Sequence, residues 1–130
     1  MRLKDKVAFI SGGARGIGAA IAKLFAREGA KVVIGDLLEE EGKKVEAQIN
    51  EIGGECLFVR LDVTNQADWA QAVQAAVSRF GKLDILVNNA GIGTARGPDG
   101  VAFTIEDLGE DQWDRVMDVN AKGVFLGTKS

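Results

Sequence analysis

The chain has 130 residues, of which 46% are hydrophobic, which is enough apolar material for one globular core but too short a chain for two. It carries 16 basic and 19 acidic residues, and the net charge of −3 argues against nucleic acid and anionic membranes as partners. Cys56 is the only cysteine, and no apolar run approaches the roughly 18 residues of a membrane span, which favours a cytoplasmic protein.

The chain contains neither histidine nor tyrosine. The missing histidine excludes Ser–His nucleophile pairs and argues against most zinc and non-haem iron sites, so we expect no metal site. Any general base within these residues would have to be Asp, Glu or Lys, and a carboxylate would need an apolar site to be tuned toward neutrality.

Four short apolar runs predict strands, in chain order at 7–10, 32–34, 57–59 and 85–87. Each run is continuous rather than alternating, as expected for strands buried on both faces of a parallel sheet. A Gly-rich stretch at 91–100 follows the last run and predicts a loop.

Apolar residues at helical spacing predict three helices between these strands, each followed by glycine. The acidic residues at 39–41 predict the solvated first turn of the second helix. This alternation predicts one Rossmann-type α/β domain over residues 1–130, with a doubly wound parallel sheet in the strand order 3-2-1-4. The predicted apolar faces are Ile17, Ile21, Leu24 and Phe25 before Gly29; Val45, Ile49 and Ile52 before Gly53 and Gly54; and Trp69, Val73, Ala76, Val77 and Phe80 before Gly81.

The segment SGGARGIG, residues 11–18, connects the first strand to the first helix. Unpaired N–H groups and the positive dipole end of a helix attract phosphate at such a turn. Gly12 is expected to make the tight turn, Gly16 to face a pyrophosphate, and Gly18 to let the helix pack closely on the strand. The G-x-x-x-G-x-G spacing differs from the common G-x-G-x-x-G fingerprint, so a Gly-rich turn without a ligand is the alternative.

Asp36 ends the second strand, eighteen residues after Gly18. A dinucleotide-binding fold places an acid there to bind the adenosine ribose hydroxyls, and a carboxylate repels the 2′-phosphate of NADP. The pattern therefore predicts NAD as the cofactor, with NADP disfavoured. Arg15, within the glycine turn, would partly offset that repulsion. The alternative is that Asp36 only caps the next helix.

Four motifs in the same order make the chain resemble the N-terminal half of the classical short-chain dehydrogenase/reductase family. The family's T-G-x-x-x-G-x-G motif matches residues 11–18, with Ser11 in place of the threonine. Its adenine-pocket aspartate matches Asp62, its N-N-A-G matches residues 88–91, and the asparagine of its catalytic tetrad matches Asn120. The cofactor-binding residues that this resemblance implies are Ser11, Gly12, Arg15, Gly16, Ile17, Gly18, Asp36, Leu37, Asp62, Val63, Asn89, Ala90 and Gly91.

Structural roles are the alternatives for several of these positions. Asp62 could instead cap the helix that follows it, and N-N-A-G could be a turn, although its place at the carboxyl end of a strand favours ligand binding. Trp69, Phe80 and Trp113 are expected to be packing residues, and Cys56 an inert residue of the core.

Asn120 lies on an apolar stripe with Trp113, Val116, Met117 and Val124, so we expect its amide to be buried. A buried amide without hydrogen-bond partners costs about 1–3 kcal/mol, so we also expect it to be paired. In the family that the chain resembles, the matching asparagine bends the helix and holds a water that connects to the catalytic lysine.

The resemblance implies an NAD-dependent oxidoreductase that transfers hydride between nicotinamide and a secondary alcohol or ketone, and that forms a homodimer or homotetramer. The family's catalytic serine, tyrosine and lysine follow the half that the chain matches, and Ser130 is not that serine, because it lies only ten residues after Asn120. We therefore expect the chain to be C-terminally incomplete for catalysis and inactive alone. A non-catalytic dinucleotide-binding or interaction module is the alternative, and an S-adenosylmethionine-dependent methyltransferase is a more distant one.

Overall fold

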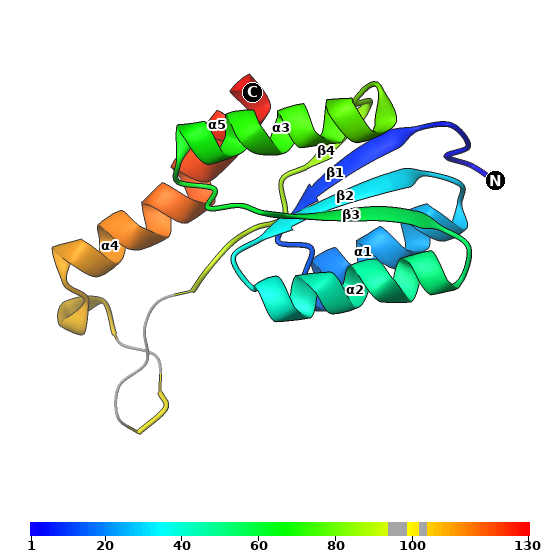
Figure 1. The fold of residues 1–130 in the computed structure, drawn as a ribbon. Coiled ribbons are helices and arrows are strands. Elements are labelled where there is room, and N and C mark those ends of the chain that lie inside the picture. The colour runs from blue at the N-terminus through cyan, green and yellow to red at the C-terminus, as the bar shows by residue number, and fades with distance from the viewer. Residues whose placement is uncertain (94–98, 102–103) are drawn as a thin grey trace.

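The described residues form a parallel sheet of four strands in the order β3-β2-β1-β4 (Figure 1). The computed structural model describes residues 1–93, 99–101 and 104–130. The predicted strands and their order 3-2-1-4 are confirmed. The strands are β1 (Val7–Ser11), β2 (Lys31–Asp36), β3 (Glu55–Arg60) and β4 (Ile85–Val87).

The strand register brings the carboxyl ends of the strands to one edge of the sheet. Ile10 of β1 pairs with Ile34 of β2 and with Val87 of β4, and Ile34 pairs with Phe58 of β3. This edge is where open α/β sheets bind ligands.

Helices cover both faces of the sheet, as Figure 1 shows: α1 (Gly16–Arg27) and α2 (Glu39–Glu51) lie on one face, and α3 (Gln66–Phe80) and α5 (Gly123–Lys129) on the other. A 3-10 helix, η1 (Ile105–Asp107), precedes α4 (Glu110–Met117). A π-helical turn, η2 (Asp118–Lys122), connects α4 to α5, and α4 projects beyond the carboxyl ends of the strands (Figure 1).

Each face of the sheet has its own buried cluster. Ile10 and Ile34 belong to the cluster under α1 and α2, whereas Phe9, Val33 and Trp69 belong to the cluster under α3. Neighbouring residues of β1 and β2 thus point into opposite cores, which explains why the apolar runs are continuous.

The predicted buried face of α1 is partly wrong. Ile17 and Leu24 are 73% and 55% exposed, whereas Gly18, Ala19 and Ala22 face the sheet. A Cβ at position 18 would overlap backbone of the glycine turn, so only small residues fit where α1 approaches it. Close approach, rather than hydrophobicity, selects the buried face of this helix.

Five further residues predicted on apolar faces are exposed, including Met117 and Val124 at 40% and 37%. Ile52 is 63% exposed because it follows the last turn of α2, and Val77 is 43% exposed at the rim of the stripe that buries Trp69 and Ala76. Trp113 is 63% exposed, so its expected packing role is wrong within the described residues, and α4 projects away from both clusters.

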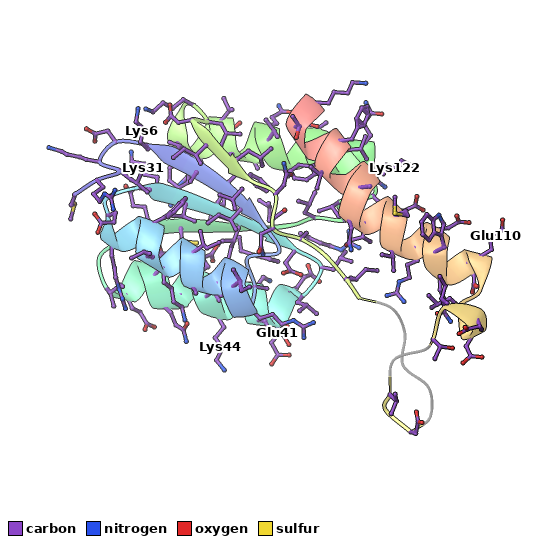
Figure 2. All side chains as sticks on the ribbon, turned by 180° about the vertical axis from the view of Figure 1, so that it is seen from behind. Lys6, Lys31, Glu41, Lys44, Glu110 and Lys122 are labelled. Atoms are coloured by element: carbon purple, nitrogen blue, oxygen red, sulfur yellow. The ribbon has the colours of Figure 1, made fainter. Side chains whose placement is uncertain are left out.

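Other expectations about packing are confirmed. Trp69 is fully buried, and its indole N–H donates to the Val63 carbonyl at 3.0 Å. Cys56 is 2% exposed, and burial raises its pKa to about 12, so the thiol stays protonated. The acidic residues at 39–41 form the exposed first turn of α2, and Figure 2 shows Glu41 and Lys44 projecting outward from this helix.

Part of the predicted loop at 91–100 lies outside the described residues, namely 94–98. Residues 91–93 have no regular secondary structure and 99–100 form a turn and a bend, as predicted for a loop. No helix in the described part of the chain has the length and apolar character needed to cross a membrane.

Candidate functional site

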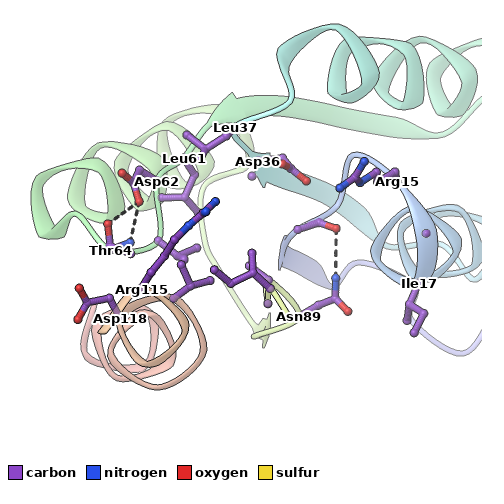
Figure 3. Close-up of a pocket in the computed structure, with 18 of the residues that line it drawn as sticks. Arg15, Ile17, Asp36, Leu37, Leu61, Asp62, Thr64, Asn89, Arg115 and Asp118 are labelled. Atoms are coloured by element: carbon purple, nitrogen blue, oxygen red, sulfur yellow. Dashed lines mark hydrogen bonds between the residues drawn. The ribbon is translucent and has the colours of Figure 1, made fainter. Parts of the chain in front are cut away.

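A cavity of about 790 Å³ opens at the carboxyl ends of the strands (Figure 3). Its walls are the glycine turn, the end of β2, the segments that follow β2, β3 and β4, and the helix α4 with the turn η2. Ser11, Gly18 and Asn120 do not line the cavity, but they contact segments that do. The predicted cofactor-binding residues that line it are Gly12, Arg15, Gly16, Ile17, Asp36, Leu37, Asp62, Val63, Asn89, Ala90 and Gly91.

The three glycines of the turn differ in their surroundings. Gly12 has φ +70° and Gly16 has φ +56°, both in the left-handed region that favours glycine. A Cβ at Gly16 would meet open space, whereas a Cβ at Gly18 would lie 2.6 Å from Asn89 Nδ2 and would overlap the Gly12 carbonyl. Gly18 therefore permits helix packing, and Gly16 leaves the start of α1 open to the cavity.

Asp36 ties the glycine turn to the end of β2. Its Oδ2 accepts from the Ala14 N–H and its Oδ1 accepts from the Leu38 N–H, both at 3.1 Å. Leu38, not Asp36, is the N-cap residue of α2, and among the described residues no side chain forms a cap hydrogen bond there. Because a carboxylate oxygen can accept more than one hydrogen bond, Asp36 keeps acceptor capacity on the cavity side.

Asp62 forms a tight turn with Thr64 (Figure 3). Its Oδ1 accepts from the Thr64 N–H at 2.9 Å and from the Thr64 hydroxyl at 2.7 Å, and this hydroxyl is the main cause that lowers the pKa of Asp62. The helix that follows is capped by Asn65, whose side chain accepts from the Asp68 N–H at 3.1 Å, so the capping alternative for Asp62 is wrong.

The N-N-A-G segment, residues 88–91, is hydrogen-bonded to the end of β1 and the glycine turn. The buried Ser11 hydroxyl accepts from the N–H groups of Asn89 and Ala90, both at 3.1 Å. The Asn89 side chain donates to the Gly12 carbonyl at 3.1 Å (Figure 3). These bonds make one rigid wall from two segments 77 to 79 residues apart in the sequence.

Asn120 lies in the π-helical turn and pairs with the backbone after the fourth strand. Its amide donates to the Ile92 carbonyl and accepts from the Ile92 N–H, both at 2.8 Å. The expected pairing of the amide is therefore confirmed, but the expected burial is wrong, because Asn120 is exposed in the described structure. The pair fixes the segment that contains Gly91, at the cavity wall.

The wall that α4 and the π-helical turn η2 contribute was not predicted from the sequence. The residues of this wall share the helical spacing i, i+3, i+4, i+7, i+8. This spacing is the signal that could have identified them, because it defines a largely polar stripe beside the apolar stripe of Asn120. Among the described residues, no group of acidic or cysteine side chains could hold a metal ion. The missed residues are Asp111, Asp114, Arg115, Asp118 and Val119.

The fold and the position of this cavity define an α/β domain of the dinucleotide-binding, Rossmann type. The family model for short chain dehydrogenases matches residues 6–130, and the chain belongs to this family.

Two curated relatives show how much of a family member the chain spans. It is 50% identical over 129 residues to a 3-alpha-(or 20-beta)-hydroxysteroid dehydrogenase of Mycobacterium tuberculosis, covering 99% of this chain and 46% of the relative. It is 41% identical over 129 residues to a cyclopentanol dehydrogenase of Comamonas testosteroni, covering 99% of this chain and 49% of the relative. The chain thus spans about half the length of the curated relatives it matches.

A solved structure agrees with this placement. The crystal structure of a 3-ketoacyl-(acyl-carrier-protein) reductase from Brucella melitensis complexed with NADH superposes with a TM-score of 0.87 at 42% sequence identity. The match covers 98% of this chain and 48% of that protein.

Proposed function

We propose that the full-length protein is an NAD-dependent oxidoreductase that transfers hydride between nicotinamide and a secondary alcohol or ketone. The observation that carries this proposal is the carboxylate of Asp36, which lines the same cavity as the glycine turn. A carboxylate at this position accepts hydrogen bonds from ribose hydroxyls and repels a 2′-phosphate, which favours NAD over NADP. Arg15 also lines the cavity and reduces this discrimination without reversing it.

The residues present fit a dinucleotide. The open space at Gly16, at the start of a helix of 12 residues, suits a pyrophosphate. Asp36 and Leu37 would hold the adenosine ribose. Asp62 and Val63 would hold the adenine, with Asp62 Oδ2 as the acceptor, since Thr64 uses Oδ1. Asn89, Ala90 and Gly91 would line the path toward the nicotinamide.

The bound nicotinamide would supply the hydride acceptor or donor, and the chain's own residues would position it. Asn120 acts as a positioning residue, because its two hydrogen bonds to Ile92 fix the cavity wall after β4. Proton transfer needs a group that this chain does not provide in the family's form, since it has no tyrosine. We propose that the catalytic serine, tyrosine and lysine lie in the remaining half of the full-length protein.

The reaction class rests on the names of the similar proteins. The hydroxysteroid dehydrogenase and the cyclopentanol dehydrogenase are named for secondary alcohols, and the 3-ketoacyl-(acyl-carrier-protein) reductase is named for a ketone. These names support secondary alcohols and ketones as the substrate class. They disfavour a non-catalytic module.

We also propose that the full-length protein is a cytoplasmic homodimer or homotetramer. The segment from α4 to α5 exposes Trp113, Met117 and Phe125, at 63%, 40% and 55%. A second copy of the protein would cover this face, and light scattering of the full-length protein should give at least twice the monomer mass. A monomer at micromolar concentration would contradict this assembly.

Calorimetric titration of the full-length protein with NAD and NADP tests the cofactor. Asp36→Asn removes the charge but keeps one acceptor for the backbone N–H groups, and Glu51→Gln is the control, because it removes a carboxylate at the far end of α2. Hydrogen bonds to a charged group contribute about 1.5–3 kcal/mol, so Asp36→Asn should weaken the affinity for NAD about tenfold to a hundredfold. Tighter binding of NADP than of NAD by the unmodified protein would overturn the proposal.

A further inference from the structure

Arg115 is the basic residue of the cavity wall opposite the sheet. It lies in α4, and Figure 3 shows its side chain extending from this helix into the cavity, in the direction of Leu61, whereas Asp118 of the same wall points away. Leu61 and Asp62 line the cavity directly after β3, so Arg115 faces the part of the cavity that belongs to this strand.

The guanidinium of Arg115 has no protein partner in the described parts of the chain. Asp111 and Asp118 lie about one helical turn before and after it, and Asp114 precedes it directly. None of these carboxylates forms an ion pair or hydrogen bond with it, and the ion pairs of the described residues lie elsewhere. An extended cation that lines a cavity without a partner is available to a ligand.

The strand order decides which part of a dinucleotide Arg115 meets. The glycine turn follows β1, and the segment of Leu61 and Asp62 follows β3, two strands away. Two strand spacings amount to about 10 Å, which separates the phosphate end of the site from the Leu61 wall. With the ribose at Asp36 after β2, the group that reaches Leu61 is the adenine ring.

We propose that Arg115 is a further cofactor-binding residue, whose planar guanidinium stacks on the adenine ring and holds it against Leu61. Leu61 is 2% exposed and rigidly packed in the cluster of Trp69, so it supplies a fixed apolar surface for one face of the ring. Arginine is suited to cover the other face, because its flat cation stacks on aromatic rings and is weakly hydrated. This inference rests on the proposed function.

The test uses the full-length protein and three ligands: NAD, 5′-AMP and nicotinamide mononucleotide. AMP and nicotinamide mononucleotide both carry a phosphate, but only AMP carries adenine. Arg115→Met removes the flat cation at similar length, Arg115→Lys keeps the charge without the plane, and Arg79→Met is the control, since Arg79 is exposed at the end of α3. Dissociation constants are measured by calorimetry, and kcat and KM for NAD by NADH absorbance.

Arg115→Met should weaken the binding of NAD and of AMP by the same factor, roughly 2- to 30-fold for a cation stacked on an aromatic ring. The binding of nicotinamide mononucleotide should be unchanged. In Arg115→Met, KM for NAD should rise while kcat stays unchanged. Arg115→Lys should recover less than half of the lost binding free energy for NAD and AMP. Arg79→Met should change none of these constants.

Two results would overturn this role of Arg115. One is normal binding of NAD and AMP by Arg115→Met. The other is an equal loss for AMP and nicotinamide mononucleotide, which would assign the guanidinium to a phosphate. If the unmodified protein binds neither NAD nor AMP, the proposed function itself fails, which is distinguishable from a failure confined to the variants.

Discussion

Gly16 and Gly53 offer a matched pair that separates backbone strain from phosphate binding. Both have positive φ, +56° and +86°, and a Cβ added to either meets open space. Gly16 begins α1 at the cavity, whereas Gly53 lies in the turn between α2 and β3, at the opposite edge of the sheet. The substitutions Gly16→Val and Gly53→Val therefore share the strain and differ in what the new side chain faces.

The strain should be similar at the two positions. A left-handed residue other than glycine costs about 1–2 kcal/mol, so each variant should lose about this much free energy of unfolding. At Gly16 the branched side chain also occupies the space proposed for the pyrophosphate. Loss of two charge-assisted hydrogen bonds, each about 1.5–3 kcal/mol, predicts at least a hundredfold weaker binding of NAD.

Urea unfolding and calorimetric titration with NAD, both on the full-length protein, measure the two effects separately. Gly53→Val should show the loss of stability with unchanged affinity for NAD. Gly16→Val should show a comparable loss of stability and little or no binding. Normal NAD binding by Gly16→Val would refute the assignment of this turn to the pyrophosphate.

Four further predictions concern the same chain. Gly18→Ala should destabilise the protein by about 1–3 kcal/mol in urea unfolding, because its methyl group overlaps the carbonyl of the turn; unchanged stability would contradict the close packing. Thr64→Val should raise the pKa of Asp62 toward its usual 3.8 in a carboxyl NMR titration. This depressed pKa stabilises the fold above pH 3.8, an effect lost as the pH falls through the folded-state pKa. Cys56, with a pKa of about 12, should resist thiol reagents until the protein unfolds, and rapid labelling at pH 8 would show that the thiol is accessible. A polypeptide limited to residues 1–130 should form no NADH from any alcohol and should associate in light scattering through its exposed β4 edge; an active monomer would show that another residue transfers the proton.

The strands and their order could be predicted from the sequence because the signals are local and redundant. The apolar runs are continuous because both faces of β1 are buried, and Gly81 ends α3 in the left-handed conformation that its position requires. The right-handed crossover between parallel strands then leaves few topologies to choose from.

The packing of individual helix faces could not be predicted in the same way. Hydrophobic spacing placed Ile17 toward the core, but the backbone approach at Gly18 admits only small residues there. Likewise, spacing placed Asn120 on a buried stripe, while the described residues leave that stripe exposed. Periodicity identifies a face, but it does not show what covers it.

The two sides of the candidate site likewise differ in how well the sequence predicts them. The glycine turn, Asp36 and Asp62 carry their own local signals, so the sequence identified one side of the cavity. The side contributed by α4 is marked only by a polar stripe at helical spacing, and this pattern does not show that the helix lies across the cavity from the end of β3. Arg115 was therefore found in the structure and not in the sequence.

A crystal structure of the full-length protein with NAD bound would show directly whether Asp36 binds the adenosine ribose. We predict that both hydroxyls of the adenosine ribose lie within about 2.5–3.0 Å of the Asp36 carboxylate, with the pyrophosphate at Gly16 and the adenine at Leu61. A dinucleotide bound outside this cavity, or bound in it with its ribose hydroxyls away from Asp36, would show that this cofactor site is wrongly assigned.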